Sequence, residues 1–156
     1  MVRLTTGLES GSQRMLDEMR KGTDLDTTRR FLADAATAGL SVRVTMILGY
    51  PGERPSDVEA SAAFLEENAD RIERVALNRF ALVTGSRLHR SIEREPAAFA
   101  DLGALRPNHR QALLDHQFAP AREPAYRRAV SRLLGAVHRI NRRPIREAAS
   151  EFEGVM

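Results

Sequence analysis

The sequence predicts an α/β protein built on parallel strands. Two apolar stretches rich in β-branched residues, 41–48 and 74–83, alternate with three segments of helical periodicity, 11–20, 25–38 and 55–68. Strands and helices in this alternation pack as parallel neighbours joined by right-handed crossovers. The 42% share of hydrophobic residues is enough for a packed core.

Turn and capping residues mark the first elements of this pattern. A short strand over residues 2–6 leads into the turn GLESGS at 7–12. Ser10 followed three residues later by Gln13 is typical of a capping box, which predicts the start of the first helix. A cation and a glycine, Lys21-Gly22, predict its end.

The pattern changes in the second half of the chain. We expect helices over 87–94 and 108–117, and a longer one over 123–141, where apolar residues recur at helical spacing. The chain therefore divides into an α/β region, 1–90, and a mainly α-helical tail, 91–156.

Three glycine-containing turns follow the predicted strands, at 7–12, 49–53 and 83–86. Parallel sheets bind ligands at the carboxyl ends of their strands, so the three turns predict one binding edge. A simpler interpretation also stands. Glycine and serine are common in turns, and Glu9 and Glu53 could merely stabilise the positive ends of the helices that follow them.

Four short motifs carry a family resemblance: GLESGS (7–12), MRKG (19–22), AG (38–39) and ILGYPGE (47–53). In this order and spacing they resemble the second half of a radical S-adenosylmethionine (SAM) core domain. The resemblance covers residues 2–90 and is closest to the cobalamin-dependent and methylthiotransferase-like groups. It implies the C-terminal half of a partial (β/α)6 TIM-like barrel.

The resemblance also implies which residues contact SAM. They are Glu9 and Ser10 near the ribose and the methionine end, Ile47 and Gly49 beside adenine, Leu82 and Val83 near the adenine amine, and Lys21 as a carboxylate partner. For Lys21, a role confined to ending its helix is an equal alternative.

The chain contains no cysteine. Disulfides, cysteine-ligated zinc and a cysteine-held iron–sulfur cluster are therefore excluded within this chain. Radical SAM enzymes hold a four-iron four-sulfur cluster on a CxxxCxxC motif in the first half of the barrel and cleave SAM reductively to a 5′-deoxyadenosyl radical. We expect this chain to be truncated and inactive alone, and to pair with a missing N-terminal half or a second polypeptide.

Basic residues concentrate in the tail: residues 106–146 hold ten arginines against Asp115 and Glu123. Such a segment could bind nucleic acid, but its only aromatic side chains are Phe118 and Tyr126, which offers little for base stacking. The alternative is that its helix faces solvent or pairs with the acidic stretch at 66–73. No metal-like pairing is evident among the four histidines, which are His89, His109, His116 and His138.

Three functions thus remain open on the sequence: a fragment of a radical SAM enzyme, a non-catalytic half-barrel that binds a partner, and an arginine-rich nucleic-acid-binding protein. The N-terminus lacks the charged and apolar regions of a secretory signal, and no run of about 18 apolar residues occurs. We therefore expect a cytoplasmic protein with no membrane partner.

Overall fold

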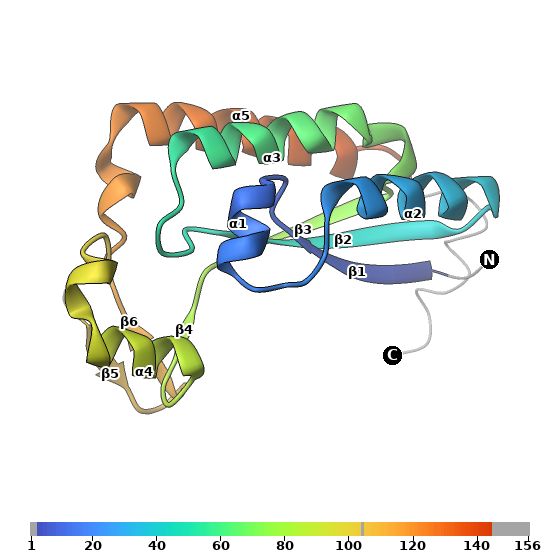
Figure 1. The fold of residues 1–156 in the computed structure, drawn as a ribbon. Coiled ribbons are helices and arrows are strands. Elements are labelled where there is room, and N and C mark those ends of the chain that lie inside the picture. Colours follow the sequence, from blue (N-terminus) through green and yellow to red (C-terminus); the bar gives the residue numbers. More distant parts are fainter. Residues whose placement is uncertain (1–2, 104, 145–156) are drawn as a thin grey trace.

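A three-stranded parallel sheet forms one layer of the molecule (Figure 1). The structure is a computed structural model and describes residues 3–103 and 105–144. The strands lie in the order β1 (Arg3–Glu9), β2 (Ser41–Leu48) and β3 (Arg74–Arg79). The predicted α/β class with parallel strands is confirmed.

Helices cover one face of this sheet (Figure 1). They are α1 (Gln13–Glu18), α2 (Leu25–Thr37), α3 (Pro55–Glu67) and α5 (Pro124–Asn141). Because successive strand residues point to opposite faces, alternate residues of β2 pack beneath the helices. Val42, Val44 and Met46 are buried there and share one core with apolar residues of α3 and α5.

The start of the first helix differs from the predicted capping box. Helix α1 begins at Gln13 and its cap residue is Ser12, whose side chain makes no capping hydrogen bond to the first turn of the helix. The Ser10 hydroxyl instead accepts a hydrogen bond from the Ser12 amide at 3.1 Å, and the Gln13 side-chain oxygen accepts one from the Leu25 amide at 3.0 Å. Ser10 and Gln13 therefore bond other partners instead of forming the local capping pair.

The predicted strand over 74–83 is wrong at its end. Strand β3 stops at Arg79, and the Phe80 amide makes a last bond to the Leu48 carbonyl at 2.8 Å. Phe80 packs edge-on against Tyr50 at 5.1 Å between ring centroids, and the chain leaves the parallel sheet there. Leu82–Val83 form β4, which belongs to a separate sheet.

A small antiparallel sheet replaces the helix expected over 108–117. Strand β6 (Leu113–Asp115) lies between β4 and β5 (Arg106–Asn108). Leu114 pairs with Leu82 and helps to form a second apolar cluster, and this non-local pairing overrides any local helical preference. The helix expected over 87–94 is confirmed as α4 (Arg87–Arg94). The remaining helical elements are short 3-10 turns: η1 (Ala69–Arg71), η2 (Pro96–Phe99) and η3 (Ala119–Arg122).

The longest helix of the tail packs on the α/β region. Tyr126, Ala129 and Leu133 of α5 are buried in the core that the parallel sheet shares with α3. The division at residues 90 and 91 stays a prediction. Among the described helices, none combines the length and apolar character needed to cross a membrane.

The basic side of α5 pairs with acidic side chains of α3, as the simpler interpretation predicted. Arg132 bonds Glu59 at 2.6 Å and Glu66 at 2.7 Å, and Arg139 bonds Glu66 at 2.8 Å. Of the ten arginines in this segment, Arg146 lies outside the described residues. These ion pairs occupy the guanidinium groups of Arg132 and Arg139, two of the ten arginines in this segment.

Candidate ligand-binding edge of the parallel sheet

The first two predicted turns lie next to each other at the carboxyl ends of β1 and β2. Glu9 pairs with Met46, and the register shifts between Gly7 and Glu9, which marks a bulge at the end of β1. Glu9 adopts a left-handed backbone conformation with φ of 61°, which is uncommon for a residue other than glycine. Two strand ends with irregular, glycine-containing backbone therefore share one edge.

Glu9 and Lys21, two predicted site residues, contact each other. The Lys21 Nζ lies 3.0 Å from Glu9 Oε1, and the exposed fractions of their side chains are 39% and 17%. A Cβ on Gly7 would meet the same carboxylate oxygen at 2.8 Å, so the Glu9 side chain folds back over the strand. The pair leaves a carboxylate and an ammonium group at the solvent-exposed edge.

Ser10 lies inside the turn. Only 1% of Ser10 is exposed, and its hydroxyl lies 3.3 Å from the Ser61 hydroxyl of α3. The Gly11 amide also donates to Ser61 Oγ at 2.9 Å. Ser61 therefore ties the turn to α3, while contact of Ser10 with SAM stays a prediction.

Ile47 and Gly49 are brought to the end of β2. Ile47 pairs with Asn78 and alternates with Met46, so it faces away from the helices. Gly49 has φ of +84°, which glycine adopts without strain and which begins the GYPGE turn. Together with Glu9 and Lys21, these residues form one edge of the sheet.

Leu82 and Val83 do not join that edge. Leu82 is buried in the second apolar cluster, and Val83 is half exposed and pairs with Leu113. The turn after them caps a helix, because the Ser86 side chain accepts a hydrogen bond from the His89 amide at 3.1 Å. Their position beside the adenine amine stays a prediction, since the parallel strand they were assigned to ends earlier.

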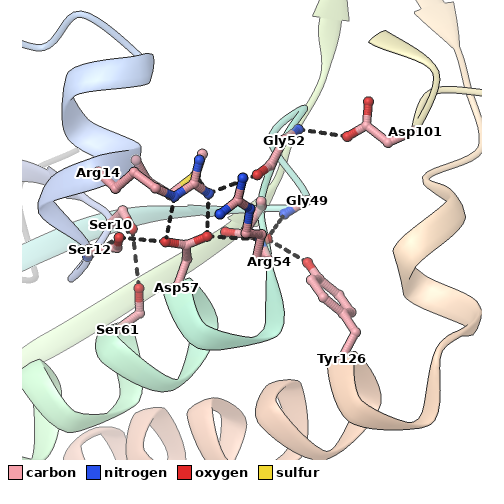
Figure 2. Close-up of polar contacts among 12 residues, drawn as sticks. Ser10, Ser12, Arg14, Gly49, Gly52, Arg54, Asp57, Ser61, Asp101 and Tyr126 are labelled. Atoms are coloured by element: carbon pink, nitrogen blue, oxygen red, sulfur yellow. Dashed lines mark hydrogen bonds and ion pairs between the residues drawn. The ribbon is translucent and has the colours of Figure 1, made fainter. Parts of the chain in front are cut away.

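Glu53 fixes the second turn from inside. Only 3% of Glu53 is exposed, and its Oε2 accepts hydrogen bonds from the Gly49 amide at 2.8 Å and the Tyr126 hydroxyl at 2.5 Å. Figure 2 shows Tyr126 of α5 reaching toward the turn that carries Gly49. The carboxylate thus joins the turn to the tail rather than capping the next helix.

Burial raises the pKa of Glu53 above its usual value, although the hydrogen bonds from Tyr126 and Gly49 oppose the shift. A carboxyl group with a raised pKa in the folded state stabilises the fold fully only below its unfolded pKa, and this contribution is lost as pH rises through the folded pKa. We expect Glu53→Gln, which cannot ionise, to gain stability relative to the natural chain as pH rises above about 4.5, the ordinary pKa of the carboxyl group.

Urea unfolding of both chains between pH 4 and pH 8 measures this difference. The Glu59→Gln variant is the control, since that exposed carboxylate bonds Arg132 alone among the residues that the structure describes. A difference between Glu53→Gln and the natural chain that stays constant with pH would contradict the expectation.

A buried network that the sequence analysis missed lies between the two turns. Asp57, in the first turn of α3, accepts hydrogen bonds from the Ser12 hydroxyl at 2.6 Å, the Arg54 amide at 2.8 Å and the Arg14 guanidinium (Figure 2). Arg14 also donates to the Gly52 carbonyl at 2.8 Å. The signal in the sequence was Asp57 itself, which stands three residues after the cap residue Arg54. An acidic side chain at that position commonly accepts a hydrogen bond from the cap amide.

Burial raises the pKa of Asp57, but the hydrogen bonds from Arg14, Ser12 and the Arg54 amide outweigh it, so the pKa lies below its usual value. Asp57 is therefore ionised at neutral pH. The network holds α1, the GYPGE turn and the start of α3 together around one charge.

The tail contacts the same turn a second time. The Gly52 amide donates to the Asp101 carboxylate at 2.6 Å (Figure 2). Across residues 3–103 and 105–144, no three histidine, aspartate or glutamate side chains gather closely enough to hold a metal ion.

Comparison with known proteins finds relatives among the ribosomal protein uS12 methylthiotransferases RimO. No protein-family model matches the chain. The chain is 39% identical over 62 residues to the ribosomal protein uS12 methylthiotransferase RimO of Flavobacterium psychrophilum. This match covers 38% of this chain and 14% of the relative. The proteins of that name from a Roseiflexus species and from Akkermansia muciniphila are 36% identical over 81 residues and 33% identical over 85 residues.

These two matches cover 51% and 53% of this chain and 17% and 18% of the relatives. The chain therefore spans less than a fifth of the length of the curated relatives it matches. About half of this α/β chain is similar to part of a methylthiotransferase.

Proposed function

We propose that this chain contributes the SAM-binding wall of a radical SAM enzyme of the methylthiotransferase-like group. The proposal rests on one observation: the GLESGS turn and the GYPGE turn lie at the carboxyl ends of two neighbouring parallel strands. Similarity to the RimO proteins supports the same group. The three parallel strands would then be the C-terminal half of a partial (β/α)6 barrel.

The residues at this edge suit a nucleoside with an amino-acid group. Glu9 offers carboxylate oxygens to ribose hydroxyls, and Ile47 offers an apolar wall to adenine. Gly49 lets the ligand approach the backbone closely, because it carries no side chain. Lys21, already paired with Glu9 at 3.0 Å, could exchange that partner for a ligand carboxylate.

An iron–sulfur cluster does not fit this chain, because the sequence has no cysteine to ligate it. The thiolates would have to come from another segment or polypeptide. In the complete protein, family resemblance implies reductive cleavage of SAM to a 5′-deoxyadenosyl radical, and no residue of this chain is assigned a step in it.

Assays for 5′-deoxyadenosine test whether SAM cleavage requires cluster ligands from outside this chain. We expect the chain alone, with SAM and dithionite, to bind no iron and to form no 5′-deoxyadenosine. The DNA upstream of Met1 should encode CxxxCxxC, and a longer protein that includes it should cleave SAM. Formation of 5′-deoxyadenosine by the chain alone would contradict the proposal.

Replacement of Glu9 tests the binding edge in that longer protein. We expect Glu9→Gln to raise the Kd for SAM about tenfold, as the loss of charge-assisted hydrogen bonds does. Glu67→Gln, on the far end of α3, is the matched control. If the two variants bind SAM equally well, the assignment of Glu9 is wrong.

A further inference from the structure

A cavity lies on the helix-covered side of the sheet. It has a volume of about 490 Å³ and is open to solvent, between the ends of β2 and β3, the segment before η3, and α5. Leu48 and Arg79 are register partners that line it, whereas Ile47 and Asn78 face the opposite side of the sheet. Apart from Gly49, none of the predicted SAM-contacting residues lines this cavity.

Aromatic and aliphatic side chains form much of the cavity wall, and aromatic contacts hold it in place. Phe118 packs edge-on against the buried Tyr126 at 5.4 Å between ring centroids, and Phe80 packs against His116 at 5.4 Å. Tyr126 is in turn held by its hydrogen bond to Glu53. Side chains that already have fixed partners lose little freedom when a ligand binds, so this site is preorganised.

The helix α5 supplies a continuous apolar strip along the cavity. Val130 and Leu134 are one turn apart on one side of the helix and both line it. Leu134 is 51% exposed, which makes it one of the most exposed large hydrophobic residues among those the structure describes. A ligand with an apolar body would remove this strip from water.

The charge at the cavity has one sign. Arg79 and Arg127 line it, and no aspartate or glutamate does. Within the described residues, neither guanidinium group has a hydrogen-bond or ion-pair partner. Arg132 and Arg139 of the same helix are instead neutralised by glutamates of α3. Two uncompensated guanidinium groups beside an apolar wall attract an anionic group.

We infer that this cavity binds a small organic anion: a molecule with an aromatic or aliphatic body and one carboxylate, sulfonate or phosphate group. Its apolar body would lie against Phe80, Phe118 and Leu134, and its anionic group would lie between Arg79 and Arg127. The volume falls in the range of pockets that enclose small ligands, about 300–1,000 Å³. The site does not depend on SAM binding or on an iron–sulfur cluster.

Fluorescence titration with anilinonaphthalene sulfonate, an apolar anion, tests this inference on the full chain. We expect saturable binding to one site, with backbone amide shifts in NMR spectra at Gly49, Phe80 and Arg127. The double variant Arg79→Gln/Arg127→Gln should bind the anion about tenfold more weakly. It should bind the neutral dye Nile red as the natural chain does.

Two further variants distinguish binding at this site from nonspecific binding of the dye. Arg128→Gln is the matched control, because Arg128 follows Arg127 in the same helix, is exposed like it, and does not line the cavity. Leu134→Asp alters an exposed position, so it should leave urea unfolding cooperative while repelling the anion. Equal weakening by Arg128→Gln, or amide shifts centred on Glu9 rather than Phe80, would overturn the inference.

Discussion

Replacing Gly11 by alanine is expected to destabilise the fold by about 3 kcal/mol or more. An added Cβ would lie 2.5 Å from the Ser61 Cα, 2.8 Å from the Phe64 Cβ and 2.9 Å from the Ala60 carbonyl oxygen. All three atoms belong to α3 and none is the end of a flexible side chain. The helix would have to move away from the GLESGS turn as a unit.

Such a movement would also break the hydrogen bond from the Gly11 amide to Ser61 Oγ. Urea unfolding measures the cost. Gly135→Ala in α5 is the control, because its added Cβ would meet only the mobile end of Arg139 at 3.4 Å. Alanine in a helix is favoured over glycine by up to about 1 kcal/mol, so the control should be neutral or more stable. A Gly11→Ala chain as stable as the natural one would refute the close approach.

Much of the parallel layer could be predicted because its signals are local. The β-branched run at 41–48, bounded by Gly39 and Gly49, is β2 as expected. The predicted starts of α2 and α3 are also confirmed, since Asp24 caps the former and Pro55 begins the latter. Glycines, caps and periodicity sit within a few residues of the element they determine.

The tail could not be predicted in the same way, because its signals are non-local. Nothing near Leu113 and Leu114 indicates that they pair with Val83 and Leu82, about thirty residues earlier. The end of β3 depends on a contact between Phe80 and Tyr50, which belongs to a different turn. Local periodicity cannot distinguish a short apolar helix from a strand that pairs at a distance.

The candidate site also combines features that local sequence predicts with contacts between distant residues. The two turns at the strand ends were predictable from their glycines, yet the groups that fix them are distant in sequence. Glu53 meets Tyr126, and Asp57 meets Ser12 and Arg14, across 43 to 73 positions. Ser10 supports its turn from inside through Ser61 and the Ser12 amide, and its contact with SAM stays a prediction.

The Asp57→Asn variant is expected to lose about 3 kcal/mol of stability at neutral pH. The substitution keeps the shape of the side chain but removes the charge that the Arg14 guanidinium, the Ser12 hydroxyl and the Arg54 amide surround. The Asp57 side chain is only 5% exposed, so water cannot replace those bonds. Arg14 is 39% exposed and can regain water, which places the cost at the lower end for a broken buried pair.

Acid should remove this difference. The pKa of Asp57 is lowered in the folded state, so its contribution is complete above the unfolded pKa of about 3.8 and is lost as pH falls through the folded value. The two chains should therefore approach each other in stability as pH falls from 5 toward 2. Glu59→Gln, which breaks an exposed pair with Arg132, should cost less than about 1 kcal/mol. If both variants lost the same stability, Asp57 would be an ordinary surface carboxylate; a larger, acid-sensitive loss identifies it as the charge around which both turns are built.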